Sequence, residues 1–475
     1  MLRLELLGWD TYPMILSGRV TSAADFASTF TEELMKGRYP LGHFYRPVTQ
    51  LAFAFDYALW GLQPFGYHLT DLAILIASGV LALLVGLHLF GSGLLGATLV
   101  GLAWVLHPVH FEILAAPPRR ADSLAVLFTL IALRVQPGPG EQRAPWRCLF
   151  VATCCLFAVG AKETGAVAAG LVFFRALASA EQRRWTTRGL QALRATWLPL
   201  VFVLVFIALR TAVLGGLGGN PRTTLVGGLA RAPHVALQYA QAVFCPRGLF
   251  GQYGTGALSV GLAAAGLVSL SFLLAQRRRG LEPGSVLSLR RGAALLGAWF
   301  TMLAIVTGMS GLTHGWYALP FLPVYCLLLG LIAGHGLAVL TSGRRVLGAC
   351  ALLAAFGLFS LNAYCSGLFE GAPEFSAASR LSREFLERFE AEVRAAPPGA
   401  RLRLGGYPPG LRVQRYRAPT DTIHILAPYS LEAYAELRVP ERIVRVKALE
   451  AKSDEANGLG DVLVVVVPGP ARDCR

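Results

Sequence analysis

The sequence predicts a mainly α protein, a polytopic membrane protein that ends in a small α/β domain. Three observations carry this prediction. The chain is 54% apolar with a mean hydropathy of +0.53. Only 15% of its residues are charged, against about 25% in soluble domains. Its arginines fall mostly in short segments between long apolar runs, which is the pattern of cytoplasmic loops.

The net charge of +15 has to be interpreted in that setting. In a soluble protein such an excess of positive charge would indicate nucleic-acid binding. Because the arginines flank apolar runs, we expect anionic membrane lipids as their partners and no nucleic acid.

Residues 1–68 are mixed in character and rich in aromatic side chains, and we expect them to form a first extracytoplasmic loop. Within this region, residues 48–60 have the pattern of an amphipathic helix that lies at the membrane surface.

The transmembrane domain is predicted over residues 69–365. A spanning helix needs about 20 apolar residues, or fewer when it is tilted or broken. The apolar runs predict about ten spans, with a long outer loop at 216–254: 69–90, 94–107, 121–135, 147–161, 164–180, 196–215, 255–275, 292–308, 317–340 and 346–364.

With these spans, all the arginine clusters fall on one face, the cytoplasmic one. The opposite face receives 1–68, the 107–120 loop, the Lys162-Glu163 junction, the 310–316 turn and the tail. Residues 1–68 then lie outside with no helix that carries them across. We therefore expect the reading frame to encode a further apolar helix upstream; a short re-entrant N-terminus is the alternative.

The tail, residues 366–475, changes character. A charged amphipathic helix is predicted over 374–396, and short strands over 401–406, 422–426, 443–446 and 461–467. These elements predict a small α/β domain on the extracytoplasmic side.

Ionisable residues are concentrated between His107 and Asp122. Such groups at a helix end in a membrane protein have a function or partners that neutralise them. His107, His110 and Glu112 would border a polar cavity and bind a phosphate or sugar; the alternative is a pair of histidines at the membrane surface. The spacing lacks the His-Glu-x-x-His pattern of zinc sites.

Arg119 and Arg120 would lie on the outer face, against the trend of positive charge inside, and so require an anionic partner. A lipid-linked phosphate fits, because guanidinium binds phosphate through two N–H groups. The alternative is pairing with Asp10 or Asp122. Asp122 occupies a natural capping position at the start of a helix, and it would border the same cavity as His107, His110 and Glu112.

The Lys162-Glu163 pair lies between two apolar runs on the same face. Lys162 would bind a phosphate and Glu163 would orient it; an interfacial pair whose side chains reach toward water is the alternative. Arg46, His314 and Tyr317 would add to the same cavity.

Asp10 stands near the start of the first outer loop. A carboxylate there would act as general base toward an acceptor hydroxyl, or hold a divalent metal such as Mg or Mn. The alternative is an ordinary loop aspartate that caps a turn.

The order of several motifs resembles the GT-C glycosyltransferases, in particular the protein O-mannosyltransferases that in eukaryotes carry tetratricopeptide repeats, and their bacterial relatives. The motifs are the segments 44–48, 56–68, 107–112, 120–124 and 161–165. Residues 316–320 look like a degenerate form of the family's Arg-Tyr-Leu-Tyr-Leu-Pro motif. The resemblance covers about residues 8–330.

This resemblance implies a membrane enzyme of the bacterial inner membrane that transfers a sugar from a polyprenyl phosphate with inversion. Asp10 matches the catalytic position, and Arg46, Arg119, Arg120 and Lys162 would bind the donor phosphate. Asp10-Thr11 stands where the family often has two acidic residues, and this departure argues against metal binding. The family's repeats are absent from this sequence, so the resemblance does not imply a protein acceptor.

Two other functions compete with the enzyme. A transporter or flippase for lipid-linked sugars would use the same charges without chemistry, but transporters typically contain internal repeats, and none is evident in this sequence. A catalytically inactive scaffold of the cell envelope would leave the charges without a role.

Overall fold

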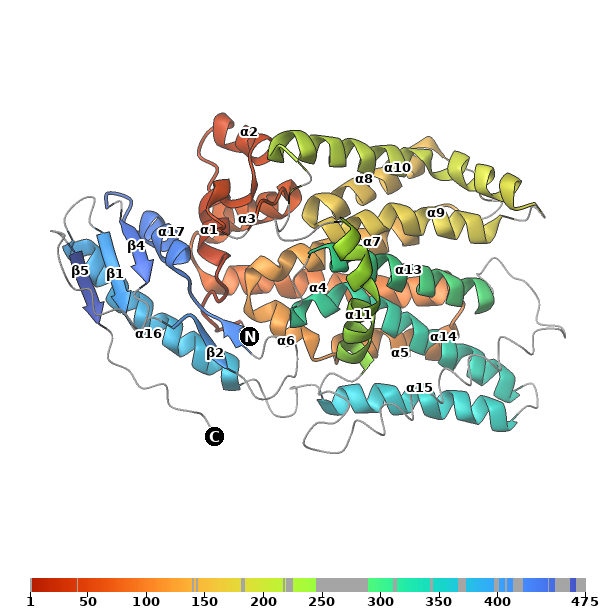
Figure 1. The fold of residues 1–475 in the computed structure, drawn as a ribbon. Helices are drawn as coiled ribbons and strands as arrows, with labels where there is room; N and C mark the ends of the chain where they lie inside the picture. The colour runs from red at the N-terminus through yellow and green to blue at the C-terminus, as the bar shows by residue number, and fades with distance from the viewer. Residues whose placement is uncertain are drawn as a thin grey trace.

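The computed structural model describes residues 2–40, 42–138, 141, 144–180, 184–216, 218, 225–244, 289–310, 314–341, 345–365, 373–396, 401–405, 408–412, 422–442, 444–448 and 462–466. The described chain is mainly helical, as predicted. A bundle of long helices extends to the right in Figure 1, and the strands lie at its left-hand end beside α1 (Thr11–Ser17).

A helix covers each predicted span except 255–275, which lies outside the described residues. Five described helices are long and apolar enough to cross a membrane, or six if α5 and α6, which are bent by 51°, form one broken span. The chain is therefore a multi-pass membrane protein. The helices that cover the predicted spans are α4 (Pro64–His88), α5 (Gly93–Val105), α7 (Arg120–Val135), α8 (Pro145–Ala161), α9 (Val167–Ser179), α10 (Trp185–Leu214), α13 (Leu289–Ser310), α14 (Leu322–Thr341) and α15 (Arg345–Cys365). The short helix α6 (Val109–Ala115) follows the bend after α5.

The long loop predicted at 216–254 was wrong, because α11 (Leu225–Phe244) occupies its centre. This helix contains Pro233 and polar residues that interrupt its apolar run. Its buried side chains Val235, Tyr239 and Val243 recur every fourth residue and pack into the bundle core. The helix forms by packing one face against its neighbours.

Close helix packing depends on small residues. A Cβ on Gly96 of α5 would come within 2.4 Å of the Gly330 carbonyl oxygen of α14. Small residues at such crossings let two backbones approach closely, which strengthens van der Waals contact where no hydrophobic effect acts between helices.

Arg120 of α7 links three helices through buried ion pairs. Its side chain is fully buried, and its guanidinium pairs with Asp56 of α3 (Pro47–Trp60) and Asp71 of α4, each at 2.6 Å. It also donates to the Tyr67 carbonyl oxygen at 3.0 Å. A buried charge is tolerated only when it is paired and hydrogen-bonded, so this cluster fixes the start of α7 against α3 and α4.

The N-terminal region contains α1, α2 (Ala23–Thr31), η1 (Leu34–Gly37) and α3. Helix α3 matches the helix predicted over 48–60. In the tail, α16 (Pro373–Ala395) matches the predicted charged helix, and α17 (Pro428–Arg438) is an additional one.

The strands of the tail confirm its α/β character. β1 (Arg401–Gly405) lies between β4 (Arg445–Ala448) and β5 (Val462–Val466) in a parallel sheet, with Leu402 opposite Val446 and Leu463. β2 (Gly410–Arg412) and β3 (Thr422–His424) form a separate antiparallel pair. We call α16, α17 and these strands the C-terminal elements.

The N-terminal segment, residues 4–17, shares one hydrophobic core with the C-terminal elements. Leu6, Leu7 and Ile15 are buried together with Phe389 of α16 and Leu431 of α17. Residues separated by most of the chain thus form a single core, and this core fixes the position of the stretch that contains Asp10.

Arg120→Met should lower the free energy of unfolding by about 3–5 kcal/mol, because it leaves two buried carboxylates without a cation. Thermal unfolding in detergent measures the effect. Arg383→Met, which removes an exposed pair with Glu5, should change the stability by less than about 1 kcal/mol. Equal losses in the two variants would contradict a stabilising role of the Arg120 cluster.

Candidate active site

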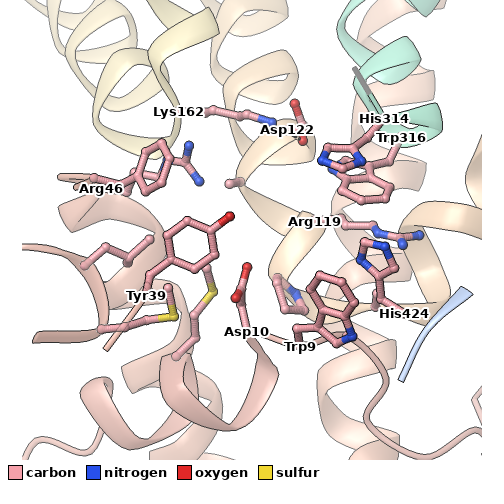
Figure 2. Close-up of a pocket in the computed structure, with 18 of the residues that line it drawn as sticks. Trp9, Asp10, Tyr39, Arg46, Arg119, Asp122, Lys162, His314, Trp316 and His424 are labelled. Atoms are coloured by element: carbon pink, nitrogen blue, oxygen red, sulfur yellow. Dashed lines mark hydrogen bonds and ion pairs between the residues drawn. The ribbon is translucent and has the colours of Figure 1, made fainter. Parts of the chain in front are cut away.

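A cavity of about 180 Å³ lies where the N-terminal segment, the start of α7 and the C-terminal elements meet. Figure 2 shows polar and aromatic side chains that converge on it from all three. The residues singled out in the sequence that line this cavity are Asp10, Arg46, Arg119, Asp122, Lys162, His314 and Tyr317.

Asp10 is brought to the cavity by a turn at Gly8, whose φ of +102° belongs to the region that favours glycine. Asp10 holds the N-cap position of α1, but its side chain makes no capping hydrogen bond. Its Oδ1 instead accepts a hydrogen bond of 2.6 Å from the Tyr429 hydroxyl. The alternative of a simple turn-capping aspartate therefore does not describe this residue.

Burial raises the pKa of Asp10, while the hydrogen bond from Tyr429 and the charge of Arg46 lower it. A carboxylate whose pKa is shifted upward is a stronger base once ionised, which suits removal of a proton from a hydroxyl.

Lys162 and Arg46 line the cavity, and each forms an ion pair with a carboxylate. Lys162 Nζ lies 2.6 Å from Asp122 Oδ2 and 3.9 Å from the centre of the Tyr317 ring. Arg46 donates to Glu163 Oε2 at 2.8 Å, and Arg210 pairs with the other carboxylate oxygen of Glu163 at 2.9 Å. Glu163 thus orients Arg46, and not Lys162 as the sequence suggested.

Arg119 is the third cation that lines the cavity. Its guanidinium pairs with the Glu112 carboxylate and lies 4.0 Å from the centre of the Trp316 ring. It does not pair with Asp10 or Asp122, the partners considered from the sequence. Glu112 and Glu163 do not line the cavity themselves; each holds a cation that does.

Three further residues that were predicted to belong to the site lie away from the cavity. Arg120 belongs to the buried cluster with Asp56 and Asp71, so its predicted phosphate contact is corrected to a structural role. His107 and His110 bond to the backbone carbonyl oxygens of Val243 at 3.0 Å and Trp104 at 2.6 Å. The His110 bond spans the bend between α5 and α6, and the His107 bond joins that bend to α11. Neither histidine lines the cavity.

An aromatic wall was not predicted from the sequence. The Trp9 ring stacks on His424 with 3.9 Å between ring centres, and Trp316 stacks on His314 at 4.2 Å. Tyr39 also lines the cavity. Trp9 was recognisable by its place next to Asp10, but nothing local marks His424 in the distant tail.

The possible metal can be tested against the donor groups present. Within the described ranges, no group of three or more His, Cys, Asp or Glu side chains is arranged to hold a metal ion. Thr11, which stands where a second carboxylate would be needed, bonds to the Leu7 carbonyl oxygen at 2.5 Å. The side chains around Asp10 therefore do not provide a set of ligands for a divalent metal.

Comparison with known proteins gives partial sequence matches. The chain is 38% identical to protein O-mannosyl-transferase tmtc2 of Xenopus laevis over 91 residues, which are 19% of this chain and 10% of the relative. It is 31% identical to protein O-mannosyl-transferase Tmtc3 of Drosophila melanogaster over 153 residues, 27% and 16% of the two chains.

The chain resembles the protein O-mannosyl-transferases. These matches confirm the resemblance to this GT-C branch that the motifs predicted. They span only a small part of the relatives, and no family model matches the sequence.

Among solved structures, ArnT from Cupriavidus metallidurans bound to undecaprenyl phosphate aligns with a TM-score of 0.48. The alignment has 14% identity over 93% of this chain and 86% of that one. The apo form of the same protein aligns with a TM-score of 0.45.

The pKa of His424 provides a test of its partly buried position beside Trp9. Burial, with a smaller effect of Arg119, lowers this pKa from 6.5 to about 4. The unfolded chain therefore binds a proton between these values when the folded protein does not, so stability should fall as the pH drops from 6.5 toward 4.

His424→Phe keeps a ring against Trp9 and removes the titrating group. Its stability should fall less over that pH range, as measured by thermal unfolding at pH 7, 5.5 and 4.5. An identical pH dependence in the wild type and the variant would contradict a partly buried, neutral His424.

Proposed function

We propose that the protein is an inverting membrane glycosyltransferase that moves a sugar from a polyprenyl phosphate to an acceptor hydroxyl on the extracytoplasmic face. The observation that supports this most directly is the cavity of Figure 2, in which the Asp10 carboxylate faces the cations Arg46, Arg119 and Lys162. The resemblance to protein O-mannosyl-transferases supports the same class of reaction.

The cations would bind the phosphate of the donor. Arg46, Arg119 and Lys162 come from separate elements and converge on one cavity. A guanidinium has five N–H donors, and a pair with one carboxylate leaves some of them for phosphate oxygens. Because each cation already has a carboxylate partner, the site tolerates the absence of donor and gains charge-assisted hydrogen bonds when the donor binds.

Asp10 would act as the general base. The acceptor hydroxyl loses its proton to Asp10 as its oxygen bonds to the anomeric carbon. The bond from that carbon to the phosphate oxygen breaks on the opposite face, which inverts the configuration. Both electrons of that bond stay with the polyprenyl phosphate, whose charge the cations stabilise. No step requires a metal.

The aromatic wall would exclude water and contact the sugar. Stacked rings such as Trp9 on His424 present large apolar faces at a low entropic cost. Mannose is the donor sugar that the relatives' names suggest. The acceptor would be a protein, a glycan or a lipid, and the membrane would be a bacterial inner membrane.

Asp10→Asn should lower turnover by roughly 10²–10⁴-fold, because an amide cannot accept the proton. The assay follows release of free polyprenyl phosphate from polyprenyl-phosphate mannose, with a membrane extract as the source of acceptor. Asp25→Asn, which changes a carboxylate of α2 that bonds to Thr21 and does not line the cavity, should retain full activity.

This assay also separates the functions that compete. A transporter would bind or move the donor without releasing the lipid phosphate, and a scaffold would do neither. Full activity of Asp10→Asn would exclude Asp10 as the base.

Arg119→Gln should raise the KM for the donor by roughly ten- to a hundredfold, since hydrogen bonds to a charged group contribute about 1.5–3 kcal/mol. Steady-state kinetics with varied donor measure the change. Arg147→Gln, which alters a surface pair with Glu141, should leave the KM unchanged. An unchanged KM in Arg119→Gln would remove this residue from the donor site.

A further inference from the structure

Tyr429 is a residue of the tail that contacts the proposed base. It lies in the first turn of α17, and its hydroxyl donates to Asp10 Oδ1 at 2.6 Å across 419 positions of sequence. Neither residue lies in a transmembrane helix of the structure. The contact therefore joins the first and the last parts of the chain at the edge of the cavity.

The surrounding contacts hold the two partners in fixed positions. The Gly8 N–H donates to the His424 carbonyl oxygen at 3.1 Å, two residues before Asp10. Tyr12 meets Tyr434 edge to face, with 4.9 Å between ring centres. These contacts and the shared core of Leu6, Leu7 and Ile15 hold the N-terminal segment against α17. They therefore keep Tyr429 within hydrogen-bonding distance of Asp10.

The hydrogen bond from Tyr429 gives the two oxygens of the Asp10 carboxylate different surroundings. Oδ1 is occupied by the Tyr429 hydroxyl. Within the described part of the chain, Oδ2 accepts no hydrogen bond, and the carboxylate points into the cavity in Figure 2. An aspartate at an N-cap would normally turn back to the helix N–H groups, which this one does not do.

We propose that Tyr429 is a positioning residue for Asp10, and that the C-terminal elements thereby form part of the active site. The Tyr429 hydroxyl holds Oδ1 and leaves Oδ2 to accept the proton of the acceptor hydroxyl. This inference rests on the proposed function.

The hydrogen bond from Tyr429 also affects the pKa of Asp10, the proposed base. A donor to the ionised carboxylate favours that form, so Tyr429 lowers the pKa of Asp10 against the opposing effect of burial. Arg46 acts in the same direction. The other ionisable groups around the cavity are Tyr39, Arg119, Asp122, Lys162, His314, Tyr317 and His424.

The test compares pH profiles of kcat/KM for the wild type and Tyr429→Phe, in the complete protein with polyprenyl-phosphate mannose. Loss of the hydroxyl should move the acidic limb about one unit toward higher pH. Tyr434→Phe is the matched control. It removes a hydroxyl from the same helix that bonds to Glu390 at 2.9 Å, and its acidic limb should coincide with that of the wild type.

A second measurement does not depend on turnover. A water-soluble carbodiimide reacts with the protonated carboxyl, so the pH midpoint of Asp10 labelling, followed by mass spectrometry, reports its ionisation. The midpoint should rise in Tyr429→Phe and stay constant in Tyr434→Phe.

The outcomes separate this inference from the proposed function. An unchanged midpoint, an unmoved acidic limb in an active Tyr429→Phe protein, or faster transfer at every pH would overturn the positioning role. A raised midpoint in a protein without transferase activity would uphold the contact between Tyr429 and Asp10 and refute the glycosyltransferase.

Discussion

The site depends on the hydrophobic core that the N-terminal segment shares with the C-terminal elements. Leu6 and Ile15 lie on either side of Asp10 in sequence and are buried against α16 and α17. This burial fixes a short stretch that would otherwise be an open loop over the bundle. The apolar contact is non-directional, and the Gly8–His424 backbone bond and the Tyr429–Asp10 bond supply the orientation.

Charge balance is the second constraint, because the site lies at the end of an apolar bundle. Every cation on the cavity wall has an acidic partner on a neighbouring element: Lys162 with Asp122, Arg46 with Glu163, and Arg119 with Glu112. Such pairing lowers the cost of placing charge near low-dielectric surroundings. It also arranges the cations so that a further anion can be shared among them.

Two neighbouring arginines illustrate how position decides role. Arg119 ends η2 (Pro117–Arg119) and borders the cavity, whereas Arg120 begins α7 and turns into the protein toward Asp56 and Asp71. Consecutive residues of a helix point about 100° apart, so the side chains diverge. The sequence places both at one helix end and cannot separate the ligand-facing arginine from the structural one.

The sequence by itself determined the membrane class, most helices and the convergence of Asp10, Arg46, Arg119, Asp122 and Lys162 on one cavity. Hydropathy and charge patterns act locally along the chain, so they can be read directly. Only the tertiary structure assigned the ion pairs, removed His107, His110 and Arg120 from the cavity, and brought His424 and Tyr429 to it. Tyr429 lies 419 positions from Asp10, and the ion pairs of the cavity wall join different elements over 7 to 117 positions. No local pattern encodes which of these residues become partners.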